Sequence, residues 1–256
     1  MIKQLHMSSS LPTLGKPMMD KFGLVPYHDK QAPALFFGCY VPRDIAAITR
    51  HKSIAVVLWG GTDAMKSLTM RAKYLKKPNI FHIAESDFIE KDLQKAGLKY
   101  KRVNMSYHRH VSNPKPLGDS VYLYASCKGR EKFYGHDVFM QLKEEMPHIK
   151  FIFSRQFQYD RDTEMPAIYE QCFINLRLTP HDGLSSTVVE AGLMGRKSVY
   201  NNTFPGAYRW KNKEDIKEAI LKEHANIGKT NIELVKEIED YLDIGTDWLT
   251  TKFWTG

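Results

Sequence analysis

The sequence predicts an α/β fold built from two parallel-sheet modules that face each other across a cleft, the first of them reduced in size. Two observations lead to this prediction. Short apolar runs alternate with helix-length amphipathic segments from residue 34 onward, as expected for parallel strands covered by helices on both faces. The alternation pauses at a proline-containing stretch, residues 111–119, and then begins again. We therefore divide the chain into modules 1–115 and 116–256.

In the first module, residues 1–34 contain prolines and little periodicity, so we expect an irregular lead-in. After it, apolar and β-branched runs predict strands, and the segments between them repeat apolar residues at helical spacing. In chain order the predicted strands are 34–40, 54–63, 79–86 and 99–107, and the predicted helices are 41–53, 64–77 and 87–97.

The second module repeats the same order. Its predicted strands are 120–126, 149–155, 173–179 and 197–202, and its predicted helices are 135–147, 164–172, 184–195 and 212–226. Two helices, 231–243 and 246–254, follow with no strand between them. The chain shows no low-complexity segment and no short repeat.

The charge is unevenly distributed. Residues 1–115 carry 19 Lys and Arg against 8 Asp and Glu, a net +11, whereas residues 116–256 carry 18 against 21, a net −3. A basic first module indicates an anionic partner, although a solvated lysine-rich face is the commoner cause. The cysteines Cys39, Cys127 and Cys172 have no metal-ligand spacing, and we interpret them as reduced thiols. Without a membrane-length apolar run or a signal peptide, we expect a cytoplasmic protein.

The stretch RLTPHDGLSSTVVEAGLMGRKSVYNN, residues 177–202, is the strongest candidate site. It runs from a strand through a polar loop into an apolar helix, and it contains two acids, Asp182 and Glu190. Ligands of open parallel sheets bind beyond the carboxyl ends of the strands, where helix N-termini present unpaired N–H groups. We expect such a cradle for a diphosphate from backbone and hydroxyl donors of Gly183, Leu184, Ser185, Ser186 and Thr187.

The segment D-G-L-S-S-T-V-V-E-A-G-L-M-G resembles the E-G-F-G-L-x-x-x-E-A-x-x-x-G motif of retaining glycosyltransferases of GT-B fold, the group of glycogen synthase and sucrose synthase. The resemblance implies two Rossmann-like domains, with Glu190 on the ribose of a sugar nucleotide and Asp182 on the donor sugar. Asp182 replaces a Glu, and Ser185 replaces a glycine. A structural alternative is that Thr187 and Glu190 form a capping box and that Gly192 and Gly195 allow close helix packing.

A basic loop, YASCKGREKFYGHD, follows the first strand of the second module. Relatives place an Arg and a Lys there on the donor diphosphate, which implies this role for Arg130 and Lys132 in preference to Lys128. Cations at this position neutralise charge that develops on the leaving group. For the nucleotide base we expect residues 155–159, with Arg155, Phe157 and Tyr159 as candidates. Arg177 and His181 flank the motif, and each is as readily a local structural partner.

In the first module, WGGTD resembles the acceptor-side turn of the same family, which implies a ligand near Gly60, Gly61 and Asp63. Asp63 fits an N-cap equally well. Ser86 or Asp87 is expected to cap a helix. The usual opening strand of this family is not recognisable in the first module. In the family the last helix commonly returns to the first module, and the resemblance implies this position for the aromatic segment 246–254.

These observations predict a retaining glycosyltransferase that moves a sugar from a UDP- or GDP-sugar to a glycan or other acceptor, itself acidic or membrane-associated. The cofactor prediction is none, with no metal required; no nucleic acid is expected, and the basic first half could contact a membrane surface. The alternative is a non-catalytic module of the same fold that binds nucleotide, glycan or polyanion. A dinucleotide oxidoreductase ranks below both because no G-x-G-x-x-G follows a predicted strand.

Overall fold

The computed structural model describes residues 1–11, 14–105, 112–125, 129–155, 158–160 and 163–256. The chain divides into two compact units. Unit 1 comprises Met1–Arg109, His181–Leu184 and Leu242–Gly256, and unit 2 comprises His110–Pro180 and Ser185–Tyr241. Residues 181–184, inside the 177–202 segment, thus belong to unit 1, as does the C-terminal segment 242–256.

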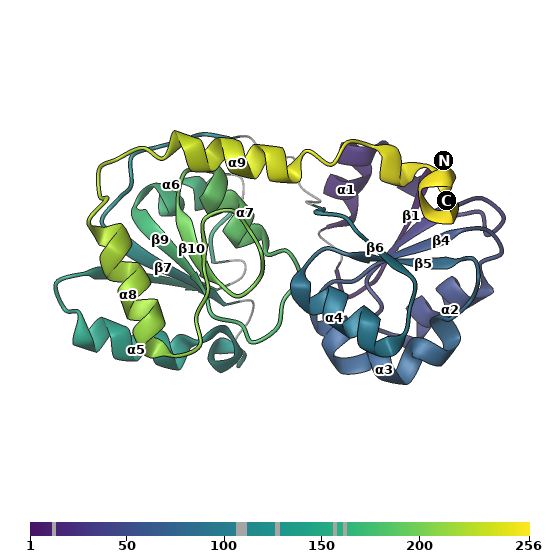
Figure 1. Ribbon diagram of the computed structural model, residues 1–256, viewed down its shortest axis with the longest axis horizontal. Helices are drawn as coiled ribbons and strands as arrows, with labels where there is room; N and C mark the ends of the chain where they lie inside the picture. The colour runs from purple at the N-terminus through teal and green to yellow at the C-terminus, as the bar shows by residue number, and fades with distance from the viewer. Residues whose placement is uncertain (12–13, 106–111, 126–128, 156–157, 161–162) are drawn as a thin grey trace. The chain divides into compact units, whose positions relative to one another are not determined.

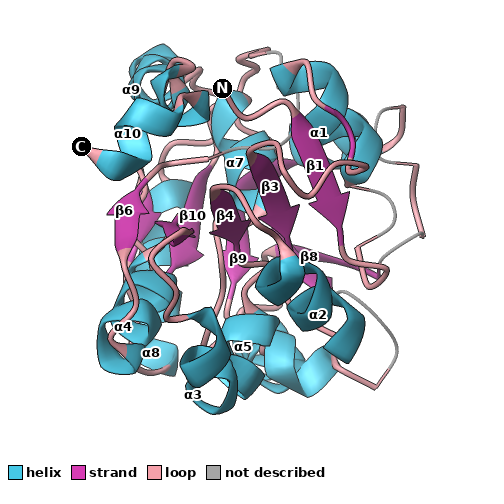
Figure 2. Cartoon of the chain, turned by 90° about the vertical axis from the view of Figure 1, so that its right-hand side faces the viewer, coloured by secondary structure: helices cyan, strands magenta, loops and turns pink. Residues whose placement is uncertain are grey.

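Unit 1 is built on a six-stranded parallel sheet in the order β2-β1-β3-β4-β5-β6. Figure 2 shows the arrows of β1, β3 and β4 following one another across this sheet. Its strands are β1 (Gln4–Met7), β2 (Val25–Pro26), β3 (Ala34–Phe37), β4 (Ala55–Leu58), β5 (Ile80–Ala84) and β6 (Tyr100–Arg102). Its helices are α1 (Gly15–Phe22), α2 (Pro42–Arg50), α3 (Thr62–Leu75), α4 (Asp87–Ala96), the 3-10 turn η2 (Asp247–Leu249) and α10 (Thr251–Thr255).

The prediction of an irregular lead-in at residues 1–34 is wrong. This region forms β1, α1 and β2, and β1 lies inside the sheet between β2 and β3. Gln4 is polar although it is buried, so β1 does not form an apolar run in the sequence. Its amide donates to the carbonyls of Asp29 and Ala32 and accepts from the N–H groups of His28 and Asp29, so its burial is fully compensated.

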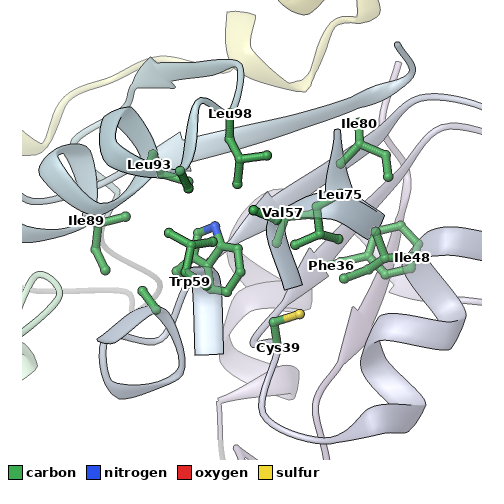
Figure 3. Close-up of a cluster of buried hydrophobic side chains, with 14 of the residues drawn as sticks. Phe36, Cys39, Ile48, Val57, Trp59, Leu75, Ile80, Ile89, Leu93 and Leu98 are labelled. Carbon is green, nitrogen blue, oxygen red and sulfur yellow. The ribbon is translucent and has the colours of Figure 1, made fainter. Parts of the chain in front are cut away.

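Helices cover both faces of the unit 1 sheet (Figure 1). One face packs against α2, α3 and α4, and Figure 3 shows part of this core around Val57 and Trp59. The other face packs against α1 and the C-terminal segment, where Trp248 and Trp254 are buried. Ile2 N–H donates to the carbonyl of Leu249, which ties the C-terminal segment to the start of the chain.

Unit 2 contains a five-stranded parallel sheet in the order β11-β10-β9-β7-β8. Helices α5 and α8 cover one face, and α6 and α7 cover the other (Figure 1). The strands are β7 (Ser120–Ala125), β8 (Lys150–Arg155), β9 (Cys172–Arg177), β10 (Lys197–Tyr200) and β11 (Ala207–Tyr208). The helices are η1 (Glu131–Tyr134), α5 (His136–Glu145), α6 (Met165–Glu170), α7 (Ser186–Leu193), α8 (Lys213–His224) and α9 (Ile232–Leu242). The short strand β11 was not predicted.

Arg196, which follows α7, joins several segments of unit 2 through hydrogen bonds of its buried guanidinium group. Its side chain is 1% exposed, and its guanidinium donates to the carbonyls of several segments of the chain. The acceptors belong to Lys115, Pro116, Tyr169, Glu170, Cys172 and Met194. The arginine thus satisfies buried carbonyl groups, which would otherwise cost free energy.

Candidate functional site

The carboxyl edge of the unit 2 sheet has a topological switch point between β7 and β9. The chain leaves β7 toward α5 on one face and leaves β9 toward α7 on the opposite face. Beyond this point the two loops lead to opposite faces of the sheet, and ligands of open α/β sheets bind in such places. Close to the sheet the loops pack against each other, because a Cβ at Gly135 would lie 2.5 Å from Cβ of Leu178.

Cationic side chains gather at this edge. Arg155 and Arg177 are the last residues of β8 and β9, and Arg130 precedes η1. The guanidinium carbon of Arg177 lies 4.7 Å from the ring centre of Tyr134, and that of Arg130 lies 5.9 Å from it. Two guanidinium groups therefore share one aromatic ring. Lys132 is exposed on η1.

Arg155 has an anionic partner of its own. Its Nε lies 3.0 Å from Oε1 of Glu131, and its guanidinium lies 5.2 Å from the ring of Phe153. The side chain is exposed, and its ion pair is expected to contribute little to stability. Of the other candidates for the base, Tyr159 is half-buried against the cluster around α6, whereas Phe157 lies outside the described residues. Lys128, the less favoured candidate for the diphosphate, also lies outside them.

Helix α7 points its N-terminus toward the same edge. The N-cap is Ser185, whose side chain makes no capping bond, so the capping-box interpretation of Thr187 with Glu190 is wrong. Ser185 Oγ lies 3.0 Å from Thr187 Oγ1. The first N–H groups of a helix have no intrahelical acceptor and carry the positive end of the helix dipole. The N–H groups of Ser186 and Thr187 are therefore suited to an anion.

Glu190 is half-exposed on α7 and accepts a hydrogen bond from a neighbouring helix. The hydroxyl of Tyr169 donates to Oε2 of Glu190 at 2.9 Å. Tyr169 is buried on α6 and packs edge-to-face against Tyr122, so its hydroxyl has a fixed position. One carboxylate oxygen is thus anchored by protein, and Glu190 is presented from a rigid helix.

Gly192 confirms the close packing that the sequence suggested. A Cβ at Gly192 would lie 2.4 Å from Cδ1 of Ile238 on α9, so only glycine lets the two helices approach. Gly195, just after the helix, has a φ of 92°, which favours glycine as well.

Asp182, Gly183 and Leu184 belong to unit 1. Gly183 N–H donates to its neighbour's carboxylate, Oδ1 of Asp182, at 3.0 Å, and Leu184 N–H donates to Oε1 of Glu85 at 3.2 Å. Ser86 Oγ donates to the carbonyl of Asp182 at 2.9 Å. The predicted cradle therefore loses the N–H groups of residues 183 and 184, which have acceptors in unit 1, and keeps those of Ser185 to Thr187.

His181 is also held by unit 1. Its Nε2 lies 2.8 Å from Oδ2 of Asp92, and its ring lies 5.1 Å from that of Phe88. Both partners are on α4, so His181 has the local structural role that the sequence left open. Ser86 is the N-cap of α4, as predicted, because its Oγ accepts from the N–H of Ile89.

The WGGTD turn places its glycines against protein atoms. A Cβ at Gly60 would lie 2.3 Å from the hydroxyl of Tyr40, and one at Gly61 would lie 3.0 Å from the nitrogen of Gly183. Gly61, with a φ of 101°, is the N-cap of α3, so the N-cap interpretation of Asp63 is wrong. Asp63 is 2% exposed and accepts from the N–H groups of Cys39 and Ala64, while burial raises its pKa.

Glu85 is a buried acid next to the candidate segment that the sequence interpretation did not single out. It follows β5 directly, beside the segment 182–184, and it is 2% exposed. Its signal in the sequence was a carboxylate at the end of an otherwise apolar strand, next to a helix cap.

No group of three His, Cys, Asp or Glu side chains that could hold a metal ion occurs among the described residues. Within the same residues, no helix combines the length and apolar character of a membrane span.

No family model matches the sequence, and no curated protein matches it. Solved structures do match. TarM superposes with a TM-score of 0.54 at 10% identity, over 94% of this chain and 57% of TarM. An S. aureus TarM mutant in complex with fondaparinux, α-GlcNAc-glycerol and UDP gives 0.53 at 10% identity, with the same coverage. Sucrose-phosphate synthase from Thermosynechococcus elongatus gives 0.56 at 10% identity, over 93% of this chain and 74% of that one.

These likenesses concern the fold. They confirm the predicted α/β class with two parallel-sheet domains. The chain spans 57% of the length of TarM.

Proposed function

We propose that the protein is a retaining glycosyltransferase that takes a sugar from a UDP- or GDP-sugar. The observation that carries the proposal is the composition of the switch point in unit 2. Arg130 and Arg177 share the ring of Tyr134 there, and α7 begins with N–H groups suited to an anion. Glu190 is presented from the same helix. Cations, helix N-terminus and carboxylate are the groups that bind a nucleoside diphosphate.

In this proposal each group has one task. Glu190 accepts hydrogen bonds from the ribose hydroxyls, and the N–H groups of Ser186 and Thr187 donate to the diphosphate. Arg130 and Lys132 stabilise the negative charge that the leaving diphosphate gains as the glycosidic bond breaks. The leaving diphosphate takes the proton of the attacking hydroxyl on the same face of the sugar, so the anomeric configuration is retained. Asp182 orients the sugar, and side-chain cations replace a metal ion.

The acceptor is proposed to be anionic or to lie at an anionic membrane surface. Residues 1–115, most of unit 1, carry a net +11. A positive field of this kind raises the encounter rate with acidic ligands and weakens as salt is added. Transfer to an acidic acceptor is therefore expected to slow with ionic strength more steeply than transfer to a neutral one.

The test begins with calorimetry of UDP, GDP, ADP and their glucose conjugates on the wild-type chain. Glu190→Ala removes the carboxylate that accepts from ribose, and we expect a loss of about 2 kcal/mol, roughly 30-fold in Kd. Tyr169→Phe leaves the carboxylate but frees its position, so a smaller loss of the same kind is expected. Glu144→Ala, an exposed acid on α5, is the matched control.

Unchanged affinity in Glu190→Ala would contradict the ribose role. The anomeric configuration of the product, measured by proton NMR, tests retention. If nucleotides bind but no sugar donor turns over with any acceptor, the chain is instead a binding module of the same fold, which the basic charge of unit 1 would also suit.

A further inference from the structure

Helices α2, α3 and α4 form one layer on the sheet of unit 1, with α3 between the other two (Figure 2). The outer side of these helices and of the loops that follow them, here called the basic face, carries charge of one sign. Between residues 41 and 99, every charged side chain that the structure describes as exposed is cationic. These residues are Arg43, Arg50, Lys52, Lys73, Lys76, Lys77, Lys91, Lys95 and Lys99.

The six acids of the same stretch are withdrawn from the surface or paired. Three of them are buried, namely Asp44, Asp63 and Glu85. Burial raises the pKa of Asp63 and raises that of Glu85 well above its ordinary value, which favours their neutral forms. The other three each lie within 3.3 Å of a basic side chain, Arg102 or His181. The basic face is therefore not balanced by exposed carboxylates of its own.

The opposite side of the unit 1 sheet has mixed charge. The elements that cover it, α1 and the C-terminal segment, expose both signs. The exposed charged residues there are Lys16, Asp20, Asp243, Asp247 and Lys252. A surface that only has to be soluble intersperses both signs in this way. The segregation of cations on the basic face thus calls for a partner.

The basic face also exposes large apolar side chains, and these lie on α3, its middle helix. Met65, Met70 and Tyr74 are 43%, 70% and 50% exposed. Met70 and Tyr74 are four residues apart, so they lie one turn apart on the same side of the helix. Lys73 Nζ lies 4.9 Å from the ring centre of Tyr74, so cation and apolar surface are in contact. Exposed apolar side chains that gather in one place commonly mark an interaction site.

A hollow opens beside the C-terminal end of α3. Its lining combines three lysines, Lys76, Lys77 and Lys99, with the apolar residues Leu75, Pro78 and Leu98. Lys77 Nζ also donates to the carbonyl of Thr49 at 2.7 Å, near the end of α2, where a cation suits the helix dipole. Ammonium groups around a partly apolar hollow match an anionic headgroup attached to an apolar chain.

We propose that the basic face docks on a lipid bilayer that contains anionic lipids. Met65, Met70 and Tyr74 enter the boundary between headgroups and acyl chains, and the surrounding lysines place their ammonium groups at the level of the lipid phosphates. The charge of the face complements an anionic bilayer. The apolar side chains favour a bilayer over a soluble polyanion, whose binding needs only the cations.

This inference rests on the membrane-surface acceptor of the proposed function and names the surface that would reach it. The two can nevertheless fail separately, because vesicle binding is measured without nucleotide. If vesicles bind and no nucleotide does, the proposed function fails and the docking face stands. If nucleotides bind and anionic vesicles do not, the docking face fails and the nucleotide site stands.

The experiment is co-sedimentation of the full chain with vesicles of phosphatidylcholine, alone or with about 30% phosphatidylglycerol. We expect the wild type to bind the anionic vesicles at least about tenfold more tightly, with the difference shrinking as salt is added. Lys73→Glu combined with Lys95→Glu should weaken this binding by at least about tenfold. Met70→Ser combined with Tyr74→Ser should weaken it about tenfold through lost apolar contact.

Each pair has a matched control in unit 2. Lys211→Glu with Lys236→Glu makes the same change in net charge at exposed positions. Met140→Ser with Leu221→Ser removes apolar side chains that are 39% and 47% exposed. Both controls should bind anionic vesicles within about twofold of the wild type. All the substituted side chains are exposed, so the variants are expected to fold, which circular dichroism checks.

Three results would overturn the proposal. The wild type could bind neutral and anionic vesicles equally, or the controls could lose as much affinity as the variants of the basic face. The third is that only the lysine pair weakens vesicle binding, while a single-stranded oligonucleotide displaces the wild type from the vesicles. That result would assign the basic face to nucleic acid instead of a bilayer.

Discussion

Replacing Glu85 by Gln is expected to stabilise the protein, increasingly so as the pH rises. The folded state holds the proton of Glu85 more tightly than the unfolded state, whose carboxyl has the ordinary value of 4.5. A carboxyl group with a raised folded pKa contributes stability below its unfolded pKa, and this contribution is lost as the pH rises toward the folded value. Gln has no proton to lose and keeps the acceptor for Leu184.

The size of the effect follows from the linkage relation. From about one pH unit above 4.5 until the pH nears the folded pKa of Glu85, the wild type binds close to one proton more when folded than when unfolded. The difference in unfolding free energy between Glu85→Gln and the wild type therefore grows by about 1.4 kcal/mol per pH unit in this window. Comparing the two proteins cancels the contribution of Asp63, whose pKa is also raised by burial.

The assay is urea denaturation followed by tryptophan fluorescence at half-unit steps from pH 4.5 to 7.5. Buried Trp59 and Trp248 both belong to unit 1, where Glu85 is. Asp20→Asn is the control, because Asp20 is exposed beside Lys16 and its replacement is expected to matter little. The presence of a buried neutral acid would be refuted if the difference in unfolding free energy between Glu85→Gln and the wild type stayed constant with pH. It would also be refuted if the unfolding free energy of the wild type rose relative to that of the variant as the pH increased.

Four further results are expected. Arg196→Met leaves several buried carbonyls without donors and should cost roughly 3–5 kcal/mol of unfolding free energy in denaturant titrations, whereas exposed Lys211→Met should cost almost nothing. Gly183→Ala places a methyl group 2.1 Å from Oε1 of Glu85 and should cost about 1–3 kcal/mol, compared with a near-neutral Gly15→Ala, which has room for the methyl group. Burial lowers the pKa of His82 to about 3 from 6.5, so the folded state binds fewer protons at this residue than the unfolded state. The unfolding free energy of the wild type relative to His82→Phe should therefore fall by up to about 1.4 kcal/mol per pH unit as the pH drops through this window. Sugar transfer should survive dialysis against EDTA, and a loss that Mg²⁺ restores would contradict diphosphate neutralisation by Arg130 and Lys132.

The predicted strands and helices from residue 34 onward agree with the structure because their periodicity reflects burial. Runs such as 55–58 and 172–177 are apolar since helices cover both faces of each sheet. The first strand, β1, was not predicted because Gln4 is polar yet buried. The side-chain amide of Gln4 makes four hydrogen bonds to backbone groups of residues 24 to 28 positions away. No local pattern records such a compensation.

The candidate site was predictable where it depends on local order and not where it depends on tertiary contacts. The strand, loop and helix around Glu190 follow from the sequence, as does the helix start near Ser185. The hydrogen bond of Leu184 to Glu85 joins residues 99 positions apart. The sequence around residue 184 therefore gives no sign that the N–H group of Leu184 already has an acceptor. The clustering of Arg130 and Arg177 on Tyr134 is likewise a product of the sheet.

Hydrogen exchange with and without UDP or GDP tests the central claim most directly, because that claim assigns the diphosphate to particular backbone donors. We expect nucleotide to slow exchange of the N–H groups of Ser185, Ser186 and Thr187 at the start of α7. The Leu184 N–H, already bonded to Glu85, should change little. Unaltered exchange at residues 185–187 under saturating nucleotide would contradict the account.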